Sequence, residues 1–422
     1  MNPRNMEELR NLTLKDAVVA VTADDSAIDN TLIKHARATG RKSFLLSFRQ
    51  NSNVRSGSII EDSVAYRQFF TLDDIINRVS SGTSSEPEEV KSTFGYFLLL
   101  YSLGVARAES MAASNLVLPD NIFPAGVNNL GHFYNVLQNL TNEGTSRDTN
   151  IAVKLLLTEK PKLHYGKRYL SPDKVAALIS GGTDSVGVSF IEHRLGKTVL
   201  PVQVIYDQAA RHQELWCVDR VAEDLGIKAD DLCIVYLPML KNFGASGLLR
   251  DDVQINAQNT KIEYVPFRNT VLLAIAIMRA ELVGAKYVAI GANHDDTLAP
   301  DGTPQYVKAI NEVIQAVDGQ VPSVIAPLLG FGGKPEIVRT GLDLGVNFSH
   351  TWSCHAYVPP PEVGLDAKSC GTCGNCATRY SAFEMLGLKD PVGYKEIPKL
   401  RTKWAGPQGN YESLRSILGI RK

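Results

Sequence analysis

Short apolar runs alternate with amphipathic stretches along the second half of the chain. Four runs rich in β-branched residues predict buried strands, at residues 174–179, 198–206, 232–237 and 286–291. Helical periodicity lies between or beside them, at residues 185–195, 212–225 and 269–283. Strands and helices that alternate at this spacing predict a parallel sheet with helices on both faces. Ligands of such sheets bind at the carboxyl ends of the strands, so chemistry is expected there.

The first part of the chain has the same α/β character. Apolar runs at residues 16–22 and 42–48 predict strands, and residues 28–39, 92–111 and 126–140 follow helical patterns. Turn formers at residues 141–149 precede a short apolar run at 151–157 and a basic, turn-rich segment. We therefore expect an N-terminal α/β domain of unassigned role (1–150), a linker with a connecting strand (151–171) and a second domain (172–422).

Length and charge narrow the class of protein. A chain of 422 residues is too long for one compact core, which agrees with more than one domain. Its 44 Lys and Arg residues balance 45 Asp and Glu residues, so nucleic-acid binding is not indicated. No stretch approaches the ~20 apolar residues of a membrane span, and the first residues lack the apolar core of a signal peptide. The sequence predicts a cytoplasmic protein that does not enter a membrane.

A glycine-rich turn follows the first strand of the second domain. It consists of Ser180, Gly181, Gly182, Thr183, Asp184 and Ser185. The glycines let the backbone turn sharply, and the amides that follow open a helix, where an anion is favoured. The two serines supply hydroxyl donors, and Asp184 suits Mg²⁺ that bridges bound phosphates. An ordinary strand–turn–helix connection with a Ser or Asp cap is the alternative.

Four of the six cysteines crowd near the C-terminus. They are Cys354, Cys370, Cys373 and Cys376, and the last three form C-x-x-C-x-x-C with intervening glycines. Four thiolates close a tetrahedral Zn²⁺ site with no open position, which predicts a structural zinc knuckle. Disulfides and an iron–sulfur cluster are the alternatives that spacing alone leaves open. His350 and His355 flank Cys354 as substitute ligands, although four cysteines already suffice.

Longer segments extend these motifs into a family resemblance. The turn SGGTDS resembles the pyrophosphate loop of ATP pyrophosphatases with the adenine nucleotide α-hydrolase-like (HUP) fold. Together with PFRNTVLLAIAIMRAELVGAKYVAIGANHDD, KPEIVRTGLDLGVNFSHTWSC and CGTCGNCATRYSAFEMLGLKDPVGY, it resembles the 7-cyano-7-deazaguanine synthase family, QueC, over residues 172–395. The resemblance implies that ATP adenylates the carboxylate of 7-carboxy-7-deazaguanine. Ammonia then gives an amide, and a second activation dehydrates the amide to a nitrile. Dimerisation is common in the family, so the resemblance also admits a homodimer.

The same resemblance suggests roles for individual residues. Arg268 and Asn269 belong to the family's P-x-RN motif near the nucleotide, and Lys334 corresponds to a lysine that contacts the phosphates. Asp184 and Lys334 are therefore the expected catalytic residues. Substrate binding is assigned to Asp295, Asp296 and Arg211. A solvent-facing lysine and a solvated acidic loop are the alternatives for these positions.

Two departures from the family pattern fall at the substrate end. The family's Y-G-Q-R-H appears with two extra residues at 206–212, and D-x-S-G-Y-P-D-C appears at 295–302 without Ser-Gly-Tyr or the cysteine. With the added N-terminal domain, this resembles QueC-like proteins of bacterial anti-phage operons such as the Qat and QueC-containing CBASS systems. The resemblance implies a protein or peptide amine as the acceptor in place of ammonia, with a partner protein as that acceptor or as a complex subunit. Ammonia stays the alternative acceptor.

Two other classes share parts of this pattern. A tRNA-modifying sulfurtransferase has the same ATP loop but needs reactive cysteines near it and a basic RNA-binding surface. A nucleotide-binding scaffold of a defence complex would need no chemistry, whereas Asp184 and Lys334 favour an enzyme.

Overall fold

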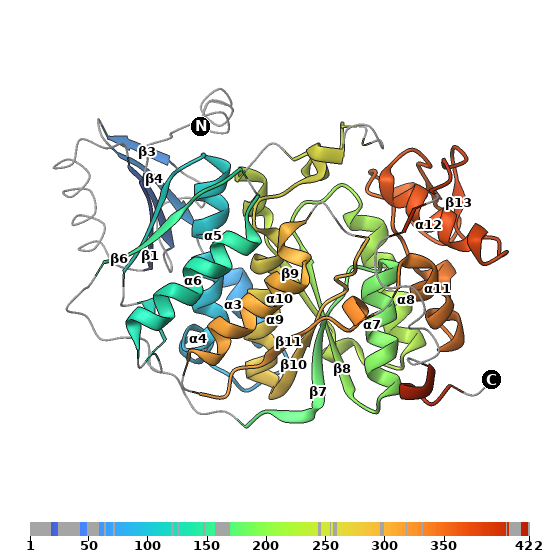
Figure 1. The fold of residues 1–422 in the computed structure, drawn as a ribbon, viewed down its shortest axis with the longest axis horizontal. Helices are drawn as coiled ribbons and strands as arrows, with labels where there is room; N and C mark the ends of the chain where they lie inside the picture. The colour runs from blue at the N-terminus through green and yellow to red at the C-terminus, as the bar shows by residue number, and fades with distance from the viewer. Residues whose placement is uncertain are drawn as a thin grey trace.

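The computed structural model of the chain contains two main sheets joined by a layer of helices (Figure 1). It describes residues 18–23, 43–48, 59–62, 65–70, 72–119, 122–124, 127, 129–146, 148–156, 169–243, 246–253, 255, 260–295, 299–317, 319–330, 332–401, 403–404 and 415–420. None of the helices within these ranges is both long and apolar enough to cross a membrane.

The central sheet is five-stranded and parallel throughout, in the order β11-β10-β7-β8-β9. Its strands are β7 (Ser171–Leu178), β8 (Thr198–Ile205), β9 (Cys233–Tyr236), β10 (Ala285–Ala289) and β11 (Ser323–Ile325). Its helices are α7 (Thr183–Arg194), α8 (Arg211–Asp224), α9 (Arg268–Val283) and α10 (Pro304–Gln315). In Figure 1, α9 and α10 lie on one side of the strands and α7 and α8 on the other. Because both faces are covered, its strands need apolar residues on both sides.

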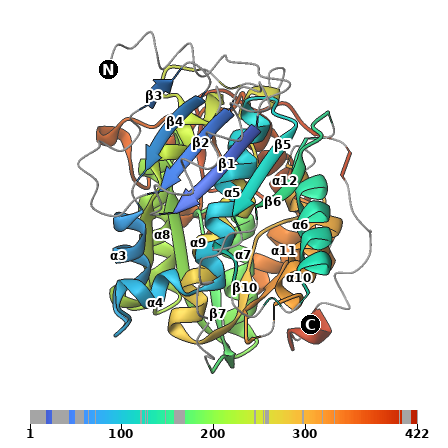
Figure 2. The same cartoon turned by 90° about the vertical axis from the view of Figure 1, so that its left-hand side faces the viewer.

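The N-terminal sheet has six strands in the order β3-β4-β2-β1-β5-β6, and only β3 runs antiparallel to its neighbour. The strands are β1 (Val18–Ala23), β2 (Ser43–Phe48), β3 (Ile59–Asp62), β4 (Ala65–Phe70), β5 (Asn115–Pro119) and β6 (Ala152–Leu156). Figure 2 shows this sheet in front of α5 (Phe94–Ser110), with α6 (Leu130–Gly144) to the lower right of its strands. The short helices α3 (Asp73–Ser80) and α4 (Pro87–Lys91) precede α5.

Helix α5 connects the two sheets. Its side chains are buried all round from Phe94 to Ala108, because one face packs on β1 and β5 and the other on α9. A helix covered on two sides needs apolar residues on both, which explains its nearly unbroken apolar sequence. A Cβ at Gly95 would lie 2.3 Å from the backbone nitrogen of Met278, so α5 and α9 touch through their backbones. The two sheets consequently share one continuous core.

The last part of the chain forms a small lobe beside α8. It contains α11 (Lys334–Asp343), α12 (Gly374–Met385) and a two-stranded ribbon of β12 (Lys368–Ser369) and β13 (Gly393–Tyr394). Figure 1 places α12 and β13 at the opposite end of the molecule from the N-terminal sheet. The four clustered cysteines lie in this lobe.

The expected parallel sheet with helices on both faces is confirmed. The four predicted strands correspond to β7, β8, β9 and β10, and the three predicted helices correspond to α7, α8 and α9. In the first part, the predicted strands correspond to β1 and β2, and the helices at 92–111 and 126–140 correspond to α5 and α6. The helix expected at residues 28–39 lies outside the described residues. The strand expected after residue 150 is β6, the edge strand of the N-terminal sheet.

Candidate nucleotide site and metal centre

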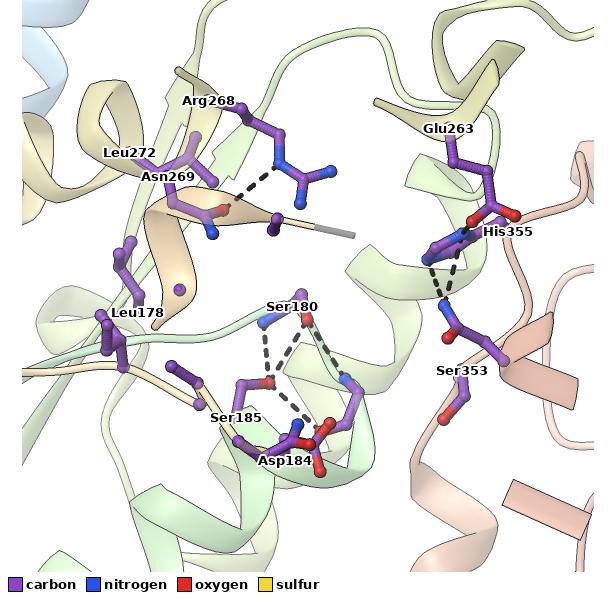
Figure 3. Close-up of a pocket in the computed structure, with 18 of the residues that line it drawn as sticks. Leu178, Ser180, Asp184, Ser185, Glu263, Arg268, Asn269, Leu272, Ser353 and His355 are labelled. Carbon is purple, nitrogen blue, oxygen red and sulfur yellow. Dashed lines mark hydrogen bonds and ion pairs between the residues drawn. The ribbon is translucent and has the colours of Figure 1, made fainter. Parts of the chain in front are cut away.

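A cavity of about 610 Å³ lies at the carboxyl ends of β7, β8 and β10. This is the edge at which parallel α/β sheets bind ligands, and the volume suits a nucleotide-sized molecule. Part of the wall is apolar, contributed by Leu178, Val204, Leu272, Leu273 and Ile290. The rest is polar and comes from the glycine-rich turn, the starts of α9 and α11, and the segment around Cys354 (Figure 3).

The glycine-rich turn has the geometry of an anion-binding loop. Gly181 has a φ of +75°, and a Cβ there would lie 2.6 Å from the Cβ of Cys217 in α8. Glycine alone meets both conditions. Gly182 then begins α7 without a side-chain cap, so the first-turn amides are left for a ligand. The Ser185 hydroxyl accepts from the Ser180 amide (3.2 Å), which brings both serine hydroxyls to the cavity.

Lys334 pairs with Asp184 at the floor of this loop. Lys334 is the first residue of α11, and its ammonium contacts the Asp184 carboxylate and the Thr183 hydroxyl (3.2 Å). The other carboxylate oxygen of Asp184, Oδ1, is buried and has no hydrogen-bond partner among the described residues. Such an oxygen suits a hard cation such as Mg²⁺. The expected catalytic pair is therefore brought together, although its chemistry stays a prediction.

The start of α9 carries Arg268 and Asn269 into the same cavity (Figure 3). Phe267, immediately before the helix, has left-handed backbone angles (φ 49°, ψ 25°), which cost roughly 1–3 kcal/mol for a residue with a Cβ. Asp301 is buried and its carboxylate accepts from the Asn269 amide (2.7 Å), so it caps the helix. The guanidinium of Arg268 lies over the ring of Tyr206, 5.9 Å from its centroid.

The opposite wall contains an acid–histidine cluster that the sequence did not suggest. The imidazole Nδ1 of His355 lies 2.6 Å from Oε2 of Glu263, and its Nε2 lies 2.6 Å from the side-chain amide of Asn375. Figure 3 shows Glu263 and His355 across the cavity from Asn269. Burial lowers the pKa of His355, but the hydrogen bond and charge of Glu263 outweigh burial and leave that pKa raised. Oε1 of Glu263 is buried without a described partner.

A second carboxylate, the half-buried Glu214, also lines the cavity. The side-chain NH2 of Gln208 donates to Oε2 of Glu214 (2.7 Å), and the side-chain Oε1 of Gln208 accepts from the backbone amide of Tyr206 (2.8 Å). Burial raises the pKa of Glu214, and the Gln208 hydrogen bond with the charges of His355 and Arg268 only partly offsets it. The only sequence signal for this residue is its place just after the altered 206–212 segment.

The three expected substrate residues have different positions. Asp295 lines the cavity, but its Oδ2 accepts from the Lys334 amide (2.8 Å) and its Oδ1 pairs with Arg401 (3.0 Å). Asp296 lies outside the described residues. Arg211 is absent from the cavity wall as described, and its guanidinium makes two hydrogen bonds to Asp251, of 2.8 and 2.9 Å. A substrate role for these residues stays a prediction.

The four clustered cysteines form a candidate metal centre. The Sγ atoms of Cys354, Cys370, Cys373 and Cys376 all lie within 4.8 Å of one another. Two of the separations are 3.4 Å and 3.8 Å, close to the ~3.8 Å expected between sulfurs bound tetrahedrally at ~2.3 Å from Zn²⁺. Backbone amides of residues 356, 370, 372, 373 and 376 donate to these sulfurs, which stabilises thiolates. The donor set therefore fits a soft divalent metal.

Local backbone and a buried ion pair shape this metal centre. Gly371 has a φ of +81°, and a Cβ there would lie 1.7 Å from the carbonyl oxygen of Glu396. Arg379 is fully buried and makes a two-point ion pair with Asp390 (2.9 and 3.0 Å). It also donates to the Thr351 hydroxyl (2.7 Å), so it supports the segment that leads to Cys354. His350 pairs with Asp224 (2.7 Å) and is outside the cysteine cluster, as is His355.

The fold and the site define an α/β protein with a glycine-rich anion-binding loop at the carboxyl edge of a parallel sheet and a candidate four-cysteine metal centre. The family model for queuosine biosynthesis protein QueC matches residues 174–387. A 7-cyano-7-deazaguanine synthase from Halobacterium salinarum is 35% identical over 239 residues, covering 54% of this chain and 99% of that protein. One from Methanosphaerula palustris is 33% identical, covering 53% and 100%. The chain therefore belongs to the QueC family.

Similarity to solved structures is weak. A predicted subunit of a tRNA methyltransferase from Methanocaldococcus jannaschii is 19% identical, covering 40% of this chain and 74% of that one, with a TM-score of 0.28. The family relationship is based on sequence and covers about half of the chain. The six-stranded sheet and helices α3 to α6, here called the N-terminal layer, lie outside the matched residues.

Proposed function

We propose that this protein uses ATP to adenylate the carboxylate of a 7-deazaguanine and then joins the activated carbon to a nitrogen. The observation that carries the proposal is one cavity in which an anion-binding glycine loop, the Lys334–Asp184 pair and Arg268 converge in a QueC-family chain. Carboxylates are poor electrophiles at neutral pH, and adenylation gives the carbon a good leaving group. The apolar part of the wall suits a flat purine or deazapurine ring.

The first step transfers AMP to the substrate. A carboxylate oxygen attacks the α-phosphorus, the bond from that phosphorus to the α–β bridging oxygen breaks, and pyrophosphate leaves. The amides at the start of α7 and the ammonium of Lys334 are placed to stabilise the charge that gathers on the leaving group. Mg²⁺ would neutralise part of the phosphate charge, and the unpartnered Oδ1 of Asp184 is the oxygen suited to hold it.

Nitrogen transfer completes the reaction. An amine attacks the acyl carbon, loses a proton, and AMP leaves to give an amide. With ammonia, the primary amide oxygen attacks a second ATP at the α-phosphorus and releases pyrophosphate. Loss of both amide protons and of AMP then gives the nitrile. An amine on a protein would stop at the amide, since its nitrogen no longer carries two protons.

The proposal also covers the nitrogen acceptor, the biological role, the metal and the compartment of the protein. The altered segments at 206–212 and 295–302 and the N-terminal layer support a protein or peptide amine and a role in anti-phage defence. The four cysteines would hold a structural Zn²⁺, because four sulfur ligands leave no open position for chemistry. Free thiolates of this kind persist in a reducing compartment, which agrees with a cytoplasmic protein.

The remaining cysteines weigh against sulfur transfer. Cys217 and Cys233 are both buried, and burial raises the pKa of the Cys217 thiol to about 12. Burial likewise raises the pKa of Cys233. Sulfur carriers act as thiolates, so these two residues are poorly suited to that role.

Mass spectrometry tests the proposal directly. The protein is incubated with ATP, Mg²⁺ and 7-carboxy-7-deazaguanine, with and without ammonium, and small molecules and intact protein masses are measured. AMP with amide or nitrile supports the biosynthetic reaction, and AMP with a deazaguanine-sized mass on a protein supports a ligase. The Asp184→Ala variant is expected to form no AMP. Absence of AMP from the unaltered protein with any acceptor would overturn the proposal.

A further inference from the structure

The N-terminal layer contacts the cavity wall through residues 263–269. This segment contributes five residues to the cavity, namely Glu263, Tyr264, Val265, Arg268 and Asn269. Its outer side faces α5 and α6, which belong to the N-terminal layer. Two separate contacts join the segment to these helices.

The first contact is a hydrogen-bonded carboxylate. The Tyr264 hydroxyl donates to Oε1 of Glu109 near the end of α5 (2.8 Å), and the Ser146 amide, just after α6, donates to the same oxygen (2.7 Å). Glu109 is largely buried, and burial raises its pKa. A single carboxylate therefore ties α5, the end of α6 and the cavity wall together.

The second contact surrounds the strained residue before α9. The ring of Phe267 is fully buried and lies edge-on to Tyr101 of α5, with centroids 6.0 Å apart. On another side it touches the last residue of α6, because a Cβ at Gly144 would lie 2.3 Å from a ring carbon of Phe267. Tyr101 in turn shares a hydrogen bond with Thr141 of α6 (2.6 Å). A left-handed backbone outside glycine persists only where its surroundings enforce it, and here α5 and α6 supply those surroundings.

We infer that the N-terminal layer sets the position of Arg268 and Asn269 in the nucleotide site. Glu109 acts through its hydrogen bond to Tyr264, and α5 and α6 act through their packing around Phe267. The inference rests on the proposed use of ATP. Glu109 and Gly144 touch no reacting atom, so they are positioning residues. Loss of their contacts with Tyr264 and Phe267 is expected to move the start of α9 and to weaken nucleotide binding, while the glycine-rich turn stays in place.

A matched pair of alanine variants of the full chain tests this inference. Glu109→Ala leaves two donors unpaired, the Tyr264 hydroxyl and the Ser146 amide. Glu281→Ala, near the end of α9, also leaves two donors unpaired, the amides of Phe94 and Gly95. These amides lie at the start of α5, the end of that helix opposite to Glu109. Both variants are expected to lower stability. Only Glu109→Ala is expected to weaken binding, by about tenfold, of the ATP analogue with a methylene group in place of the α–β bridging oxygen.

Two further measurements keep the test decisive. Glu109→Gln retains the accepting oxygen and should bind the analogue within about twofold of the unaltered protein. Hydrogen exchange should become faster at residues 264–271 in Glu109→Ala and stay unchanged there in Glu281→Ala. Equal exchange and equal binding in the two alanine variants would overturn the inference. Failure of the unaltered protein to bind the analogue would instead overturn the proposed function, and exchange would still decide whether the layer holds the segment.

Discussion

The two sides of the cavity are built in different ways. The side at α7 comes from one contiguous run, residues 180–185, to which Lys334 adds its ammonium. The opposite side is assembled from Glu214, Glu263 and His355, which come from three distant parts of the chain. The first side is made of backbone amides, hydroxyls and a cation suited to phosphate. The second is made of two carboxylates, one buried and one half-buried, and a histidine.

The difference extends to what holds each side in place. The glycine-rich turn is held by the hydrogen bonds between its own serines, by the close approach of Gly181 to Cys217 in α8, and by the Trp352 amide, which donates to the Gly181 carbonyl (2.8 Å). The opposite side depends on the metal centre, because His355 follows Cys354 and Asn375 precedes Cys376. Loss of a metal from the four cysteines should therefore disturb the acid–histidine wall more than the phosphate side, because the turn keeps the hydrogen bonds between its own serines.

The largest effect is expected at the phosphate side. Lys334→Met removes the cation that neutralises the departing pyrophosphate, so AMP formation should fall at least about a hundredfold. Pyrophosphate release under saturating ATP measures this change. Lys197→Met is the matched control, since Lys197 also pairs with a carboxylate, Glu192 (2.5 Å). Lys197 lies just before β8 begins, at the opposite edge of the sheet. Similar losses of rate in both variants would show that Lys334 acts through stability alone.

The metal centre should give the next largest effect. Gly371→Ala places a Cβ against the carbonyl of Glu396 at a left-handed backbone position, so we expect a loss of more than about 3 kcal/mol of stability and less bound metal. Gly387→Ala is the control, because Gly387 is also left-handed but a Cβ there meets nothing within 4 Å. The Gly387→Ala variant should lose about 1 kcal/mol of stability and bind as much metal as the unaltered protein. Metal analysis and thermal unfolding measure both, and equal metal content in the two variants would contradict the assignment.

The contiguous features of the molecule could be predicted from the sequence. Four of the five strands of the central sheet appear as β-branched runs, and α5 appears as an apolar stretch, because burial on both faces demands such residues. The three-residue edge strand β11 is too short to give such a run and was not predicted. The four cysteines could be grouped by their spacing, and their sulfurs do come together. Each of these features depends on neighbouring residues alone.

The assembled features could not be predicted in the same way. Glu263 and His355 are 92 positions apart, and nothing local to either one indicates the other. Asp295 looked available for substrate because it follows a strand. Its oxygens are in fact engaged by the start of α11 and by Arg401, both distant in sequence. Tertiary structure decides whether a carboxylate faces a ligand or caps a helix.

A smaller effect, on stability, is expected from Glu214 on the acidic side of the cavity, and this effect should depend on pH. The folded-state pKa of Glu214 is raised by burial above its ordinary value of 4.5, so ionisation costs the folded protein stability as pH rises through that range. Glu214→Gln keeps an oxygen to accept from Gln208 but cannot ionise. The variant's melting temperature, relative to the unaltered protein, should therefore be higher at about pH 8 than at about pH 5. A difference that is constant, or that shrinks with rising pH, would show that Glu214 is not held in a charge-disfavouring site.

The smallest effect is expected for Arg211. Its guanidinium pairs with Asp251, which is 43% exposed, and such a pair contributes less than about 1 kcal/mol. Arg211→Ala should therefore change stability little, and KM for the deazaguanine carboxylate should stay within about twofold because the residue is not on the described cavity wall. Steady-state kinetics with the carboxylate varied at saturating ATP measures this. A tenfold rise in KM with unchanged kcat would instead support the substrate role that the sequence suggested, with Arg211 exchanging Asp251 for the substrate carboxylate.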